Sequence, residues 1–280
     1  MSTPQHQSPL INIGAYSVYL MMVSVMCWPT FSHLATVWIS GADYHQAAFA
    51  LPLAGLLIWL RRADAPRIKP TAGSIKLAIL IGLPANFLLI VSRIFDVDVL
   101  GHLGFALVLI AGFIACFGVA FSRHHKAALM FSLFLVPLGD ALLYPMQSLT
   151  ALSVETIFKS TGMTIERDAL LLTTQSGRFL VAEACAGMRM MITSMMIGGF
   201  YAILTLKRND HIALVVMCAG AVGIGINIFR AWLMVFLATL SDMKIATGYD
   251  HYLFGMMIYF MTFAVIIILV RKLAAQLNSH

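Results

Sequence analysis

Long apolar runs are the feature that most constrains what this chain can fold into. A helix that crosses a bilayer needs about 20 mainly apolar residues, and eight runs approach that length. They lie at about residues 12–31, 46–60, 75–92, 99–121, 127–145, 186–206, 212–240 and 252–270. Charged residues make up only 11% of the chain, against about 25% in a soluble domain. We therefore expect an all-α integral membrane protein with about eight transmembrane helices.

The basic residues predict how these helices are oriented. Lys and Arg gather in the 60–76, 122–126 and 207–211 loops and near the C-terminus, whereas the alternate loops hold more acids. Cytoplasmic loops carry the excess of Lys and Arg, so eight spans place both termini in the cytoplasm. The net charge of +6 follows from this distribution. We expect membrane lipid as a partner and no nucleic acid, and the N-terminus lacks the pattern of a cleaved signal peptide.

One long segment interrupts the predicted spans on the non-cytoplasmic side. Residues 149–160 could form an amphipathic surface helix, with Leu149, Leu152, Thr156 and Phe158 near one face. The stretch "GMTIERDALLLTTQSGRFLVAEAC" that follows is typical of a β-hairpin, because short apolar runs flank the turn-like "RDA" and "QSG". The hairpin could offer an edge on which an extended peptide docks.

We interpret the whole chain, 1–280, as a single membrane domain in three parts. These are spans one to five at 1–145, an extracytoplasmic segment at 146–184, and spans six to eight at 185–270.

Cys185 differs in its setting from the other three cysteines. Cys27, Cys116 and Cys218 lie inside apolar runs, whereas Cys185 lies in "VAEACAGMRM" at the predicted outer end of the sixth helix. Exposed N–H groups at a helix start favour an anion, and the thiolate is the nucleophilic form of cysteine. The small Gly187 nearby leaves room for a substrate backbone. Alternatively, Cys185 is a small hydrophobic residue with no chemistry.

An arginine lies inside the seventh predicted span. If that helix starts near Ile212 on the cytoplasmic side, Arg230 lies about 27 Å across a core of about 30 Å, at the depth of Cys185. Ionisable residues within a span usually mark a functional site. Asn227 is one turn away and could orient the guanidinium. Arg230 could instead extend to the membrane interface or pair with Asp140 in span five.

A histidine precedes the eighth span. His251 closes "YDH" at the predicted outer boundary, and histidine is suited to proton transfer near neutral pH. Asp250 is its neighbour in sequence, although adjacent helical residues do not face each other. His251 could also be an interfacial residue without chemistry. The rival histidines on the same side are His33, His45 and His102.

A thiol, a guanidinium and an imidazole together supply the groups that acyl transfer needs: a nucleophile, an oxyanion stabiliser and a general acid/base. Two other classes of function remain. A transporter or channel would use Arg230 and Asp140 within the membrane. An outer-face metal enzyme would need ligand spacings, and no CxxC or close Cys/His spacing occurs in the sequence, so we expect no metal and no cofactor.

Three stretches in order, "ERDALLLTTQSGRFLVAEACAGMR", "NIFR" and "DHYLFG", resemble the exosortase/archaeosortase family of membrane enzymes. That family has a VAEACSG-type cysteine motif, a downstream N-x-x-R and a histidine before the last span. The resemblance covers about residues 145–270, and the one departure is Ala186 in place of the usual serine.

The resemblance implies about eight helices and a cysteine-dependent protease/transpeptidase at the periplasmic face of the bacterial inner membrane. Its partners would be exported proteins with a C-terminal sorting tail (PEP-CTERM-like), in a setting that is often an exopolysaccharide operon. Cleavage would pass through a thioester on Cys185, with Arg230 on the oxyanion and His251 as acid/base. Supporting or substrate-binding roles fall to Asn227, Arg189, Glu183, Gly187, Asp140 and Asp250.

Overall fold

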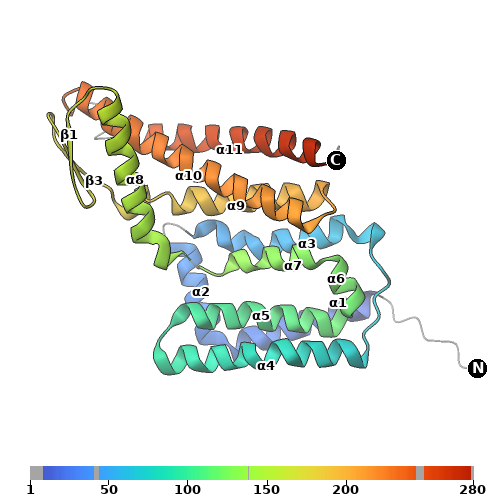
Figure 1. The fold of residues 1–280 in the computed structure, drawn as a ribbon. Coiled ribbons are helices and arrows are strands. Elements are labelled where there is room, and N and C mark those ends of the chain that lie inside the picture. The colour runs from blue at the N-terminus through green and yellow to red at the C-terminus, as the bar shows by residue number, and fades with distance from the viewer. Residues whose placement is uncertain (1–8, 41–43, 138, 244–248, 279–280) are drawn as a thin grey trace, which may run out of the picture. The chain divides into compact units, whose positions relative to one another are not determined.

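The computed structural model describes residues 9–40, 44–137, 139–243 and 249–278, apart from the side chains at 9–10, 140–141, 249–256, 258–259 and 278. The chain divides into two compact units, Met1–Leu138 and Gly139–His280, and each is described by itself (Figure 1). The single membrane domain over 1–280 stays a prediction.

Every regular element in the described residues of the first unit is a helix. Its α-helices are α1 (Pro9–Met26), α2 (Trp28–Ser40), α3 (Ala50–Leu60), α4 (Ala72–Phe95), α5 (Asp98–Phe117), α6 (Val119–His124) and α7 (Lys126–Phe131). Short 3-10 turns precede α3 and follow α3 and α7. Thr71 and Ser74 exchange side-chain and backbone hydrogen bonds at the start of α4, which satisfies two N–H groups that a helix start leaves without partners.

The first predicted span is bent. Helices α1 and α2 meet at 92° at Cys27, inside the run predicted at 12–31. Pro29 explains the break, because proline has no N–H to continue the α1 ladder and its ring crowds the carbonyl four residues earlier. Proline is tolerated in the first turn of a new helix, and α2 begins at Trp28.

The fifth predicted span, 127–145, is also interrupted, and here the prediction of one helix is wrong. Helix α7 passes into a 3-10 turn that ends at Leu135, and Val136 is extended, with ψ at 123°. The residue before a proline is driven to this conformation, and Pro137 follows it. A new helix, α8 (Asp140–Ser160), then begins at Asp140. Asp140 therefore starts a helix rather than lying within span five.

Length and composition identify five helices among the described residues that could cross a membrane, or six if the bent α1–α2 pair is one span. The runs predicted at 46–60 and 127–145 correspond to shorter apolar helices, His45–Leu60 and Lys126–Leu135. The multi-pass membrane class is therefore supported, but the count of eight spans is not confirmed.

The second unit joins α8 to a small sheet and three long helices. The sheet has strands β1 (Ile165–Asp168), β2 (Leu171–Thr174) and β3 (Arg178–Leu180), paired antiparallel in that order. The predicted hairpin is thus present, and a third strand extends it. The turns fall at the predicted "RDA" and "QSG", where Ala169 adopts a positive φ of 52°. The long helices are α9 (Met188–Thr205), α10 (Asn209–Leu240) and α11 (Tyr249–Asn278).

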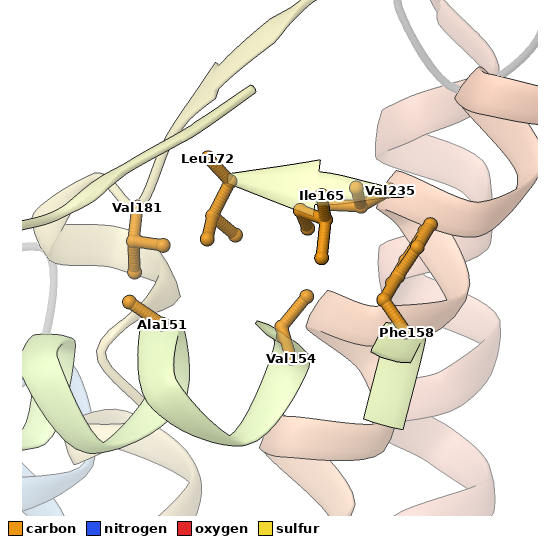
Figure 2. Packing of buried hydrophobic residues seen from close by; sticks show 7 residues of the cluster. All are labelled: Ala151, Val154, Phe158, Ile165, Leu172, Val181 and Val235. Carbon is orange, nitrogen blue, oxygen red and sulfur yellow. The ribbon is translucent and has the colours of Figure 1, made fainter. Parts of the chain in front are cut away.

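One face of α8 packs against the sheet and α10. Ala151, Val154 and Phe158 on α8 are fully buried against Ile165, Leu172, Val181 and Val235 (Figure 2). The spacing of three and four residues is that of one helix face. Of the residues predicted to lie near one face of this helix, only Phe158 packs against the sheet, whereas Leu149 and Leu152 are 44% and 48% exposed. Helix α8 also begins nine residues before the predicted 149.

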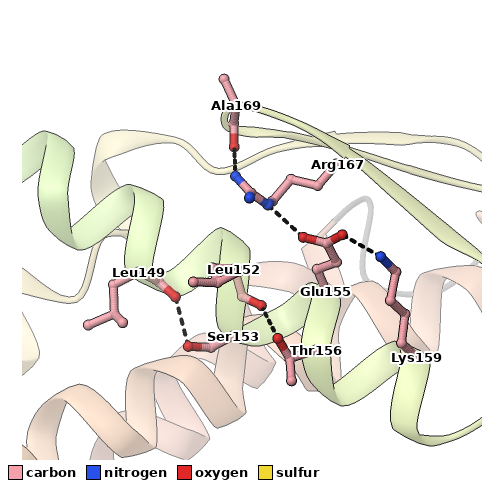
Figure 3. Close-up of polar contacts among 8 residues, drawn as sticks. All are labelled: Leu149, Leu152, Ser153, Glu155, Thr156, Lys159, Arg167 and Ala169. Atoms are coloured by element: carbon pink, nitrogen blue, oxygen red, sulfur yellow. Dashed lines mark hydrogen bonds and ion pairs between the residues drawn. The ribbon is translucent and has the colours of Figure 1, made fainter.

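An ion-pair network fastens β1 to α8 (Figure 3). Glu155 accepts hydrogen bonds from Lys159 Nζ at 2.7 Å and from Arg167 Nε at 2.6 Å. These two bonds, first that from Lys159 and then that from Arg167, lower the pKa of the Glu155 carboxyl below its ordinary value. Arg167 Nη1 also donates to the carbonyl of Ala169 in the first turn, so the network links the helix, the strand and the turn.

Candidate functional site

Cys185 lies in a turn between the sheet and α9. Residues Glu183–Cys185 form one 3-10 turn, in which the Cys185 N–H donates to the carbonyl of Ala182 at 2.8 Å. Gly187 is the N-cap of α9, which begins at Met188. The expectation that Cys185 caps this helix is therefore wrong, and the thiol lies one turn before the helix starts. Cys185 is a free, half-buried cysteine.

Two side chains of helix α10 donate hydrogen bonds to backbone carbonyls of this turn. Asn227 Nδ2 donates to the carbonyl of Cys185 at 2.9 Å, and Arg230 Nη2 donates to the carbonyl of Ala184 at 3.3 Å. Arg230 Nη2 also donates to Asn227 Oδ1 at 3.3 Å, so the amide of Asn227 connects the guanidinium to the thiol-bearing turn. Asn227 is 1% exposed, and a buried amide with partners on both ends has a fixed orientation.

Gly187 allows this close approach. Its φ of +91° is a left-handed conformation, which residues with a Cβ adopt at a cost. A Cβ at Gly187 would also lie 2.7 Å from Asn227 Nδ2, closer than such atoms can pack. The absence of a side chain therefore lets Asn227 reach the Cys185 carbonyl.

A cavity of about 240 Å³ joins Cys185 to Arg230. Nine of its eleven lining residues are apolar, and the other two are Cys185 and Arg230 themselves. The walls come from α8, β2, β3 and α10. Thiol and guanidinium, 45 positions apart in the chain, thus line one cavity.

One hydrogen-bond donor of Arg230 has no acceptor among the described residues. This donor, Nε, is buried, whereas Nη2 is used by Ala184 and Asn227. An unsatisfied buried donor is costly. Arg230 also lines the cavity beside the thiol, so its guanidinium is suited to bind an oxygen that arrives with a substrate.

Two further predicted residues lie close to the turn in sequence. Arg189 is the second residue of α9 and half-buried, and Glu183 is exposed at the start of the 3-10 turn.

Asp140 begins α8, while Asp250 and His251 lie in the first turn of α11. The side chains of these last three lie outside the described residues, so their contacts stay predictions.

The rival histidines lie in the first unit. His33 Nδ1 and His102 Nε2 are 3.0 Å apart with stacked rings, and His33 Nε2 lies 3.7 Å from Asp98. His45 contacts the carbonyl of Trp38. In the described parts of the chain, no three His, Cys, Asp or Glu side chains are grouped so as to hold a metal.

Sequence reasoning did not find the cavity walls. Phe179, Met234 and Met243 line the space beside Cys185, yet in the sequence they look like ordinary apolar residues. The alternation in "GRFLV" did hold a signal, because Phe179 and Val181 fall on one face of β3.

Comparison with known proteins gives one match. A family model described as Transmembrane exosortase (Exosortase_EpsH) matches residues 38–268, which include Cys185, Arg230 and His251. No curated protein and no solved structure matches the chain.

Proposed function

Because the chain belongs to the transmembrane exosortase family, we propose that it is a cysteine peptidase/transpeptidase embedded in the membrane. It cleaves the C-terminal sorting tail of exported proteins through a thioester acyl-enzyme. Family membership supports a membrane transpeptidase role on exported proteins in general. The residues that perform the reaction are proposed from the site geometry.

The observation that carries the proposal is the shared cavity of Cys185 and Arg230. Acyl transfer needs a nucleophile beside a donor that can receive the developing oxyanion. The Cys185 thiol supplies the first, and the guanidinium of Arg230, which lines the same cavity, supplies the second. A guanidinium is permanently charged, so the donor is available at every relevant pH.

The proposed reaction has two steps. The Cys185 thiolate attacks the substrate carbonyl, and the oxyanion is bound by the Arg230 guanidinium. The C–N bond then breaks, the leaving amine takes a proton from His251, and a thioester remains on Cys185. In the second step His251 accepts a proton from water or an acceptor amine, which attacks the thioester and releases the thiolate.

Other residues position these groups. Asn227 holds the guanidinium and the thiol-bearing turn together, and Gly187 admits the substrate backbone. Arg189 contacts the substrate or the thiolate, with Glu183 as its partner. We assign to Asp140 the role of an anion that supports Arg230, and to Asp250 a supporting or substrate-binding role.

The proposed substrate tail consists of a short PEP-like motif, a transmembrane helix and a basic end. Its apolar helix would lie in the bilayer beside the enzyme, which requires a site at the membrane surface. We place that site at the periplasmic face of the bacterial inner membrane, with both termini in the cytoplasm, as the distribution of Lys and Arg predicts.

Transport is the second candidate, and the bent pair α1–α2 favours it, since transporters contain broken helices. Against it, α10 runs unbroken from Asn209 to Leu240 through the glycines of "CAGAVGIGIN" and past Arg230. A transporter would also leave the pairing of Cys185 with Arg230 unexplained.

The deciding experiment replaces Cys185 by Ala in the native host and follows an exported protein with a hydrophobic C-terminal tail by immunoblot. We expect the tail-bearing form to accumulate at unchanged enzyme abundance. The matched control is Cys218→Ala, which removes an exposed cysteine of α10 and should leave processing intact. Normal processing by Cys185→Ala would overturn the acyl-transfer proposal and leave transport as the function to test.

Arg230→Ala and Arg230→Lys complete the test. Loss of one oxyanion donor costs about 3–4 kcal/mol, or about 10²–10³ in turnover. Lysine has no planar fork, so it cannot bind Ala184, Asn227 and an oxyanion together, and it should fail nearly as badly.

A further inference from the structure

We infer that the cavity beside Cys185 is a specificity pocket, which takes an apolar side chain of the substrate near the bond that is broken. This inference rests on the proposed function. It assigns selection of the substrate to residues of α10 and β3 rather than to the thiol and the guanidinium.

The chemistry of the walls sets the kind of side chain. The apolar lining includes Leu172, Phe179 and Val181 from the sheet and Ala231, Met234 and Val235 from α10. The two polar groups of the lining, Cys185 and Arg230, are those assigned to the reaction. Apart from Arg230, which is assigned to the reaction, the walls offer no partner to a charged or amide side chain that has lost its water, so the pocket favours an apolar one.

The volume sets the size. A cavity of about 150 Å³ lined by Leu, Ile and Phe holds one benzene molecule. The present cavity, at about 240 Å³, has room for a leucine, methionine or phenylalanine side chain. Two methionines, Met234 and Met243, lie in its wall, and their flexible side chains can adjust to occupants of different shape.

The sheet offers a way to present such a side chain. β3 is an end strand, paired only with β2 in the described sheet. The Val181 N–H donates to the carbonyl of Leu170, and that of Thr174 to Gly177. Because bonded and non-bonded residues alternate in an antiparallel pair, the N–H and C=O of Arg178 and Leu180 point away from β2.

An extended substrate could pair with this edge. Phe179 in β3 and Val181 just after it project from the opposite face to Arg178 and Leu180, and Phe179, Leu180 and Val181 all line the cavity. Every second side chain of an added strand would project from the same face as Phe179. Backbone pairing would then give affinity, and the pocket would select the side chain.

The pocket can be tested without a known substrate. The purified full-length protein in detergent is treated with methyl or benzyl methanethiosulfonate. Each reagent transfers its methylthio or benzylthio group to a cysteine thiolate, which forms a mixed disulfide and releases methanesulfinate. Mass spectrometry gives the rate at each cysteine. Cys218, exposed on α10, serves as the internal reference for uptake of the reagents into micelles.

We expect the benzyl-to-methyl rate ratio at Cys185 to exceed that at Cys218 by about tenfold, the discrimination that a small apolar group brings in a fitted pocket. Ala231→Leu fills the cavity and should reduce the ratio to that of Cys218. The matched control, Ala221→Leu, makes the same change at an exposed position of α10 and should leave the ratio unaltered. Equal ratios at the two cysteines, no reaction at Cys185, or a ratio insensitive to Ala231→Leu would each overturn the inference.

A second variant tests the pocket independently, in case Ala231→Leu fails to fold. Met234→Ala enlarges the pocket and should raise the relative rate of a naphthylmethyl reagent over the benzyl one at Cys185 alone. An unchanged rate would count against the pocket.

The outcomes separate the pocket from the proposed function. A high ratio together with normal processing by Cys185→Ala would refute the peptidase and leave an apolar binding pocket. Loss of processing by Cys185→Ala together with equal ratios would support the peptidase and refute the pocket.

Discussion

The second unit contains two regions that pack in different ways. One is the cap, which we define as α8 with strands β1–β3. The other is the helix bundle of α9, α10 and α11. The cap buries large side chains such as Phe158, Leu172 and Ile165. The bundle brings backbones together at glycines, and a Cβ at Gly223 on α10 would lie 2.7 Å from the Met190 carbonyl of α9.

This difference is what we expect if the cap lies in water and the bundle in lipid. In water, burial of large apolar side chains drives packing. In lipid, burial of apolar surface gains little, so helices associate through close packing of small residues. The thiol-bearing turn joins the two regions, because Cys185 follows the cap and Gly187 is the N-cap of α9. The predictions below separate these two kinds of stability, in order of decreasing effect.

The largest effect is expected for Phe158→Ala. It removes a fully buried side chain from the cap core and should cost about 3–5 kcal/mol. Hydrogen exchange should accelerate in residues 163–181 while α9 and α10 stay protected. Leu152→Ala, on the exposed face of the same helix, is the control. Equal acceleration by both variants would mean that the cap is not held by this core.

Gly223→Ala should disturb the bundle and spare the cap. Its Cβ would lie 2.6 Å from Ser194 Oγ and 2.7 Å from the Met190 carbonyl, so α9 and α10 must separate at a cost of about 1–3 kcal/mol. The thermal midpoint in detergent should fall. Gly225→Ala, two residues on, meets nothing within 4 Å and should be neutral or slightly stabilising. A fall of the midpoint in both variants would contradict close packing as the cause.

Gly187→Ala acts at the junction. The left-handed φ of +91° costs a residue with a Cβ about 1–2 kcal/mol, and Asn227 must move. Processing should fall more than stability does, since misplacement by about 1 Å can cost about 10²-fold in rate. Gly162→Ala is the control, because its φ is +79° but nothing lies within 4 Å. If both variants retained full processing, the Asn227 bridge would have no part in the reaction.

The smallest effect belongs to the ion pairs of the cap. The fold lowers the Glu155 pKa, so this contribution is present above the ordinary pKa of glutamate and is lost as pH falls through the lowered value. We expect less than about 1 kcal/mol, measured as cap protection against protease between neutral and acid pH. Glu155→Gln should remove this pH dependence, and Glu166→Gln, at an exposed position of β1, should keep it.

The sequence was informative where one local signal decides the structure. "RDA" and "QSG" are strong turn signals, and both turns are present. The sequence was misleading where tertiary contacts determine which of two apolar helix faces is buried. Helix α8 has apolar residues on two faces, and only the sheet determines that Ala151 and Val154, rather than Leu149 and Leu152, are buried.

The candidate site shows the same division. Proximity of Cys185, Asn227 and Arg230 was expected from helix geometry, and all three contact one turn or cavity. The hydrogen bonds that join them are accepted by the backbone carbonyls of Ala184 and Cys185. Every residue has such a carbonyl, so the sequence does not indicate which ones accept these bonds. The cavity walls come from four separate elements, so their meeting depends on the whole unit.

These two carbonyl bonds have a mechanical consequence. The thiol-bearing turn is hydrogen-bonded to α10, the helix that carries the guanidinium. We therefore expect a movement of α10 to carry both Cys185 and Arg230 with it. Transmembrane helices tilt to match the thickness of their bilayer, and α10, at 32 residues, is long enough to do so. When it tilts, Cys185 and Arg230 move together, and their spacing is independent of the lipid that surrounds them.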